Sequence, residues 1–179
     1  PMANPFYHDI GLSKDMVGTV RGSIGLFASF AGIAAGGFCA LKLGYMRALI
    51  IGGILQAAAV AAFATLAYAG PNLALFSAVM TGDNFGISFA GVALVAYMSS
   101  LTSFGYTATQ YALLSSTYAW VGKILKGFSG ATVEFLSAQY GLMHAYGIFF
   151  VGAGAIGIPA VILFAILSAR LKRRVPVAA

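Results

Sequence analysis

Long apolar runs, separated by short polar or glycine- and proline-containing breaks, dominate the chain. A helix needs about 20 mostly apolar residues to cross a bilayer core of about 30 Å. About five stretches meet this length, which predicts membrane-spanning helices at residues 15–40, 46–69, 72–101, 107–138 and 143–169. A closed barrel would instead show alternating strands of about ten residues. The pattern therefore predicts an all-α fold, a polytopic bundle of about five transmembrane helices.

Composition supports a membrane protein. Hydrophobic residues make up 60% of the chain and charged residues 8%, against about 45–50% and about 25% in soluble domains. The single cysteine, Cys39, provides neither a disulfide framework nor a set of metal ligands. We therefore expect no metal site and no cofactor.

Basic residues predict which way the chain crosses the membrane. Alternating spans place residues 41–47, the junction at 102–106 and the C-terminus on one side, and the opposite side carries only Lys14. The basic residues of the first side are Lys42, Arg47, Arg170, Lys172, Arg173 and Arg174. Because positive charge accumulates in cytoplasmic loops, we predict a cytoplasmic C-terminus. The net charge of +6 then reflects anchoring to membrane lipid and does not indicate nucleic-acid binding.

Small and polar residues recur at helical spacing within the spans. In the first span they are Gly18, Gly22, Gly25, Ser29, Gly32 and Gly36. Such a face allows another helix to approach closely, either for static packing or for sliding during gating. Asn84 and Ser88 belong to a polar stripe of the third span, and Lys123 and Glu134 belong to one of the fourth. The two stripes predict a shared polar interior lined by these residues.

Asp83 is the only charged side chain between Leu73 and Met98. A charge at the middle of a bilayer costs on the order of 3 kcal/mol on insertion scales, so such residues usually pair or face a cavity. One interpretation is an ion pair between Asp83 and a basic residue such as Lys123 or Arg21. The other is that Asp83 binds and releases a proton during transport.

Other polar residues within the spans are candidates for ligand contact. Lys123 and Lys126 together would suit an anionic substrate group, although Lys126 could instead extend to the interface or pair with another helix. Lys123 and Glu134 lie about three helical turns apart, too far to pair directly. Gln56 is interpreted as a hydrogen bond between helices or as a ligand contact.

The segment GGFCALKLGYMRAL resembles the loop motif that follows the second helix in each half of major facilitator carriers. Gly37, Lys42, Gly44 and Arg47 fit this pattern, whereas Leu41 stands where the motif has Asp. The resemblance implies that these four residues form a gating loop.

Two further segments resemble AmpG-type muropeptide permeases of that superfamily: SSLTSFGYTATQYALLSSTYAWVGKILKGFSG, and ANPFYHDIGLSKDMVGTV at the start. The resemblance implies that residues 1–179 form the second, C-terminal six-helix half of a carrier. Its first helix would be mostly missing and its N-terminal half absent. It also implies import of anhydro-muropeptides, N-acetylglucosamine-anhydro-N-acetylmuramyl peptides, across the bacterial inner membrane by proton symport. Carboxylates on these solutes would suit Lys123 and Lys126.

Other functions remain open. The chain could belong to a major facilitator carrier for another anionic solute, such as acetyl-CoA, or to a receptor or assembly subunit that does not transport. It could also be an intramembrane enzyme that uses Asp83 and Glu134 as paired acids. Because no nucleophile motif, phosphate loop or metal-ligand spacing occurs in the sequence, we predict a carrier rather than an enzyme.

Overall fold

The computed structural model describes residues 3–102 and 107–174, and every regular element in those ranges is helical. The elements are α1 (Ala3–Asp9), α2 (Lys14–Val20), the π-helical segment η1 (Arg21–Gly25), α3 (Leu26–Leu43), α4 (Tyr45–Ala69), α5 (Leu73–Ser100), α6 (Thr107–Gly127), α7 (Ser129–Tyr140) and α8 (Leu142–Arg174). The predicted all-α membrane fold is confirmed. The part of the junction at residues 103–106 lies outside the described residues.

Among the described residues, 4 helices are long and apolar enough to cross a membrane. They are Lys14–Leu43, which joins α2, η1 and α3, and then Tyr45–Ala69, Leu73–Ser100 and Leu142–Arg170. Each corresponds to one of the predicted spans.

The prediction of one continuous span over residues 107–138 is wrong. The chain instead forms α6 and α7, which meet at Phe128. Gly127 ends α6, and the Ser129 hydroxyl donates a hydrogen bond of 2.7 Å to the Lys126 carbonyl oxygen. Glycine weakens a helix interior, and a hydroxyl that bonds to the backbone competes with the helical pattern. The polar stripe drawn from Lys123 to Glu134 therefore crosses a break between two helices.

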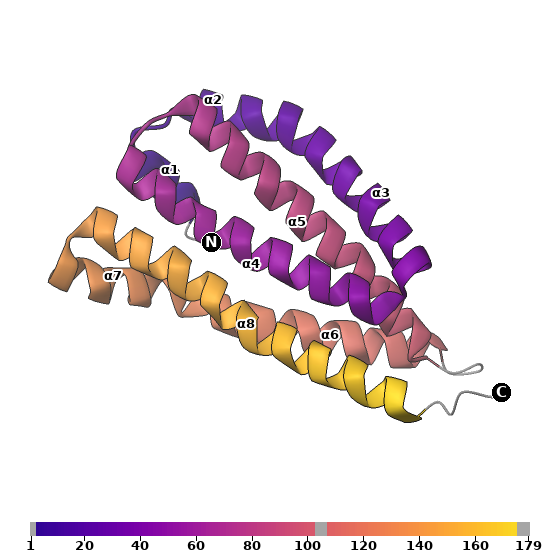
Figure 1. Ribbon diagram of the computed structural model, residues 1–179. Coiled ribbons are helices and arrows are strands. Elements are labelled where there is room, and N and C mark those ends of the chain that lie inside the picture. The colour runs from indigo at the N-terminus through magenta and orange to yellow at the C-terminus, as the bar shows by residue number, and fades with distance from the viewer. Residues whose placement is uncertain (1–2, 103–106, 175–179) are drawn as a thin grey trace.

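The long helices lie side by side in the spatial order α3, α5, α4, α8 (Figure 1). Helix α7 packs along α8, while α6 has no buried residue. Sharp turns join successive helices at Gly44, Gly70 and Gly141, where φ is 84°, 68° and 80°. Glycine occupies these turns because a β-carbon is strained at such angles.

The short helix α1 inserts an aromatic cluster among α4, α5 and α8. The Phe6 ring lies 4.8 Å from that of Tyr146 and 4.9 Å from that of Phe150, and the Tyr7 ring lies 5.1 Å from that of Phe76. Phe6 is fully buried. Burial of these rings holds the start of the described chain within the bundle.

Glycines bring α3 close to α5. An ideal β-carbon at Gly36 would lie 2.7 Å from the Phe89 carbonyl oxygen, and one at Gly32 would overlap the Phe85 carbonyl oxygen. The predicted small-residue face is thus used for packing at these positions. Gly18 and Gly22, at the other end of the same face, have open space around them.

We expect Gly36→Ala to destabilise the protein by about 1–3 kcal/mol, because the added methyl group meets backbone atoms of α5 that cannot move aside alone. The matched control is Gly37→Ala, whose β-carbon would find only Val92 at 3.9 Å. Thermal unfolding of both variants in detergent would measure the difference. Equal stability of the two variants would contradict close packing at Gly36.

Candidate functional site

A polar contact joins α4 and α5 in the middle of their apolar lengths. The Gln56 side-chain amide donates from Nε2 to Asp83 Oδ1 over 3.3 Å, and both residues are half-buried. The interpretation of Gln56 as a hydrogen bond between helices is therefore confirmed. Asp83 faces a neutral donor on α4, as expected for a carboxylate that lies away from bulk water.

The side-chain oxygen of Gln56 has no hydrogen-bond partner in the part of the chain that the structure describes. Gln56 Oε1 is buried and accepts no hydrogen bond from the described residues. It lies over Gly86 of α5, where an ideal β-carbon would approach it to 3.3 Å. A buried acceptor without a donor is unusual, since its desolvation is not compensated. This contact therefore has unused hydrogen-bonding capacity beside the carboxylate of Asp83.

Of the described cations, Arg21 of η1 is the one whose charge reaches Asp83. Its charge interacts electrostatically with the Asp83 carboxylate, but the described residues contain no direct ion pair between Asp83 and Arg21 or Lys123. Instead, Arg21 Nη1 donates to Asn4 Oδ1 over 3.1 Å, and the guanidinium lies 5.6 Å from the centre of the Tyr7 ring. An ion pair of Asp83 with Arg21 or Lys123 is therefore not formed among the described residues. Proton binding by Asp83 stays a prediction.

The π-helical turn of η1 lies beside this site. Two glycines within it, Gly22 and Gly25, and the bond from the Ser23 hydroxyl to the Thr19 carbonyl oxygen favour a departure from the α-helical pattern. Single π-turns in α-helices are frequent at functional sites. Both glycines belong to the predicted small-residue face, but their spacing did not predict the π-turn.

Asn84 and Ser88 face α3. Asn84 donates from Nδ2 to the Met80 carbonyl oxygen over 2.8 Å, and its Oδ1 lies 3.5 Å from the Ser29 hydroxyl. An ideal β-carbon at Gly32 would lie 3.0 Å from Cβ of Ser88. Within this chain, these two residues of the polar stripe are in the contact between α3 and α5, and their role in lining a cavity stays a prediction.

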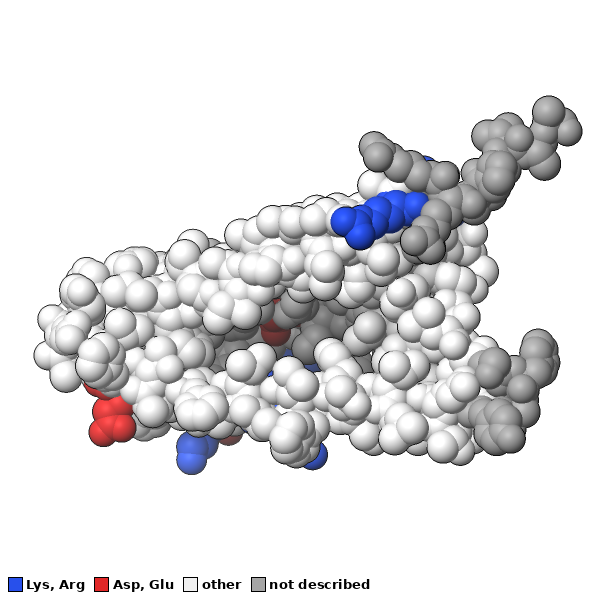
Figure 2. All heavy atoms as spheres, turned by 90° about the horizontal axis from the view of Figure 1, so that it is seen from below, with Lys and Arg blue, Asp and Glu red and all other residues white. Residues whose placement is uncertain are grey.

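The predicted charged residues on α6 and α7 are exposed and do not come together with Asp83. Neither Lys123, Lys126 nor Glu134 forms an ion pair with another described residue. Lys126 lines a cavity of about 740 Å³ between α4, α8 and the break at Phe128. Most of that lining is apolar, from Val60, Phe149 and similar residues. Seen from below, this face is hollowed, and charged atoms of both signs are visible inside the hollow (Figure 2).

The four residues of the loop motif lie where α3 turns into α4. Gly44 is the one residue between the two helices, Gly37 lies within α3, and Lys42 Nζ is 5.3 Å from the centre of the Phe38 ring. Arg47 lines a second cavity, of about 480 Å³, between this turn and the ends of α5 and α8. The motif thus forms a tight turn beside a recess that Arg47 lines, while its gating role stays a prediction.

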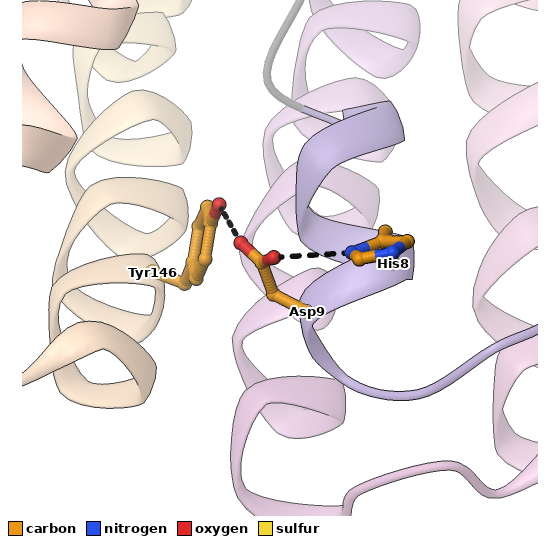
Figure 3. A network of polar contacts seen from close by, with 3 residues as sticks. All are labelled: His8, Asp9 and Tyr146. Atoms are coloured by element: carbon orange, nitrogen blue, oxygen red, sulfur yellow. Dashed lines mark hydrogen bonds and ion pairs between the residues drawn. The ribbon is translucent and has the colours of Figure 1, made fainter.

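One polar network was not predicted from the sequence. Tyr146 of α8 donates to Asp9 Oδ2 over 2.7 Å, and Asp9 Oδ1 lies 3.5 Å from His8 Nδ1 (Figure 3). His8 and Asp9 are adjacent in the sequence, but their link to a tyrosine 137 residues away depends on how α1 packs against α8. The network fastens α1 to α8 at the end of the bundle away from Gly44 (Figure 1).

The helices, their length and their internal polar contacts define a multi-pass membrane protein. No protein-family model matches the chain. Individual proteins do match the chain. Where the name of such a protein states a function, it is that of a transporter or permease.

The chain is 30% identical over 171 residues to "Putative transporter AmpG 4" of Rickettsia felis, a match that covers 96% of this chain and 39% of that protein. It is 30% identical over 164 residues to "Anhydromuropeptide permease" of Escherichia coli K12, covering 91% of this chain and 32% of the permease. A Haemophilus influenzae protein, "Uncharacterized protein", is 35% identical over 135 residues, or 72% of this chain and 32% of that protein. The resemblance to AmpG-type permeases is therefore confirmed, and the chain spans about a third of the length of these relatives.

A double-mutant cycle would measure the contact between Gln56 and Asp83. We expect Gln56→Leu to lower the free energy of unfolding by about 1–3 kcal/mol, because it leaves the half-buried carboxylate of Asp83 without its hydrogen-bond donor. The double variant Asp83→Leu with Gln56→Leu should lose less stability than the two single variants added together. The difference should be about 1 kcal/mol or more. Thermal unfolding of the complete polypeptide that contains this chain provides the readout.

Asp83→Asn is the matched control for this cycle, since its side-chain oxygen can still accept from Gln56. Its stability should stay close to that of the wild type. Strict additivity of the two leucine variants would show that the contact contributes no coupling energy.

Proposed function

We propose that this chain is part of a secondary active carrier that imports anhydro-muropeptides across the bacterial inner membrane. It would supply the C-terminal half of a major facilitator carrier, with the other half contributed by the rest of a longer polypeptide. Carriers of this kind bind their solute near the midplane, between two halves that rock to expose the site alternately on each side. The observation that carries the proposal is the similarity to the Escherichia coli permease across 91% of this chain.

Gln56 and Asp83 provide a chemical basis for coupling transport to protons. The carboxylate form of Asp83 accepts a hydrogen bond from Gln56 Nε2. A protonated Asp83 is itself a donor, and Gln56 Oε1, which has no partner among the described residues, is an acceptor on the same amide. Rotation of one amide therefore allows either form of Asp83 to be bonded without moving α4 or α5.

The charges support a cytoplasmic position for the end that contains Gly44. Lys42 and Arg47 flank this turn, and α8 carries Arg170 near the same end of the molecule (Figure 1). At the opposite end, Lys14 is the one lysine or arginine in the loops and helix starts that the structure describes. This distribution follows the positive-inside rule.

An intramembrane enzyme is less consistent with the geometry. Asp83 bonds to Gln56 inside the bundle, whereas Glu134 is exposed on α7. The two carboxyl groups do not form a catalytic pair in this arrangement, because paired acids must flank one reacting bond. The relatives' names likewise indicate transport.

Uptake by the complete polypeptide in proteoliposomes would test the proposed function. We expect a labelled anhydro-muropeptide to accumulate when the pH gradient drives protons in the direction of uptake, and not to accumulate without a gradient. Accumulation of acetyl-CoA or another anionic solute in place of the muropeptide would contradict the proposed substrate.

Asp83→Asn should lower gradient-driven accumulation by about tenfold or more, because an amide cannot take up and release the proton. Exchange of labelled for unlabelled solute, which needs no net proton movement, should persist. Asp15→Asn is the matched control, since Asp15 is an exposed carboxylate in the first turn of α2. Unchanged accumulation by Asp83→Asn would exclude Asp83 as the coupling residue.

A further inference from the structure

A separate recess lies where α1, the following turn and α2 meet the π-helical turn. Its volume is about 300 Å³. The residues that line it are Asn4, Tyr7, His8, Leu12, Lys14, Val17, Gly18 and Arg21. None of them was predicted as a contact for a ligand.

The polar groups of this recess suit an anion. Two of its lining residues are cations, Lys14 and Arg21, and none is Asp or Glu. Neither cation forms an ion pair with any carboxylate in the part of the chain that the structure describes. A recess with positive charge and no internal counter-charge attracts a negatively charged group from outside.

The side chain of Arg21 is held in place and still has donors to spare. Its Nη1 donates to Asn4, and its guanidinium lies against the Tyr7 ring, which is itself buried. A guanidinium has five N–H donors in a planar fork, which matches the two oxygens of a carboxylate. The amide of Asn4, whose oxygen already accepts from Arg21, retains its own N–H donors for a ligand.

Arg21 also connects the recess with the centre of the bundle. Its charge acts on Asp83, the proposed proton carrier, while its side chain lines the recess. An anion bound in the recess would offset part of the positive charge that Arg21 presents to Asp83, without any direct contact between Arg21 and Asp83. Binding of the solute and of the proton would then depend on each other, as linkage between two sites requires.

We propose that this recess binds a carboxylate of the transported solute, with Arg21 as the main contact and Lys14 and Asn4 as further donors. The proposal rests on the proposed function, because the peptide part of an anhydro-muropeptide carries free carboxylates. It locates their recognition at the end of α1 and at η1, rather than at Lys123 and Lys126 on the exposed helix α6.

The test compares two solutes in proteoliposomes of the complete polypeptide, made from uncharged phosphatidylcholine. One is a labelled anhydro-muropeptide with free peptide carboxylates, and the other is the same molecule with these carboxylates amidated. The wild type should show a KM about tenfold higher for the amidated solute, the loss expected for one charge-assisted contact.

Arg21→Gln should raise the KM for the acidic solute by about tenfold and leave the KM for the amidated solute nearly unchanged. Lys14→Gln should act in the same direction with a smaller effect, and Arg21→Lys should restore part of the affinity. The matched control is Arg170→Gln, an exposed cation near the opposite end of the bundle, which should preserve the discrimination.

The outcomes separate the two proposals. No uptake of either solute by the wild type overturns the proposed function. Uptake of both with equal KM, or an Arg21→Gln variant that still discriminates, overturns the carboxylate recess alone. An effect of Arg21→Gln that appears only when phosphatidylglycerol is added would mean that the recess binds a lipid phosphate, and would also overturn it.

Discussion

The close approach of α5 to the helices on both of its sides is the constraint on which the rest of the structure depends. Glycines of α3 admit the backbone of α5 near Phe89, and an ideal β-carbon at Gly52 of α4 would lie 2.9 Å from Cα of Ala90. Lipid supplies no hydrophobic drive between helices, so contact of this kind must come from small residues that allow backbones to meet. At this spacing Gln56 reaches Asp83, and Ser29 lies beside Asn84.

The close spacing of the helices also stabilises the carboxylate of Asp83 inside the bundle. A carboxylate in an apolar region is tolerated only with a donor or an opposite charge nearby. Asp83 has a donor from α4 and feels the charge of Arg21 from η1. Because those partners come from two different helices, any movement of α5 relative to either one changes the surroundings of the carboxylate. Such a change is what the proposed role of Asp83 in proton coupling requires.

The short helix α1 helps to position the side chains around Arg21. Aromatic residues of α1 fill the space among α4, α5 and α8, and Asp9 is fastened to Tyr146. These contacts orient Asn4 and Tyr7 toward Arg21, so that the guanidinium has a defined position. In contrast, α6 has no buried residue. A packed group of helices beside an uncovered one is consistent with a chain that covers about a third of its relatives' length.

The amino-acid sequence by itself determined the membrane class and the four helical stretches long and apolar enough to cross a membrane, with boundaries correct to within a few residues. It could do so because apolar length and small-residue spacing are local properties. It also indicated the contact of Gln56 with another helix, since a lone amide in an apolar span needs a partner. Only the tertiary structure decided which carboxylate that partner is, that Arg21 acts at a distance and that Tyr146 bonds to Asp9. These relations join residues far apart in the chain. Helical periodicity shows which residues share a face, but not which helix that face meets. The break at Phe128 and the π-turn at Arg21 depend on backbone hydrogen bonds whose alternatives differ little in energy, so composition alone did not predict them.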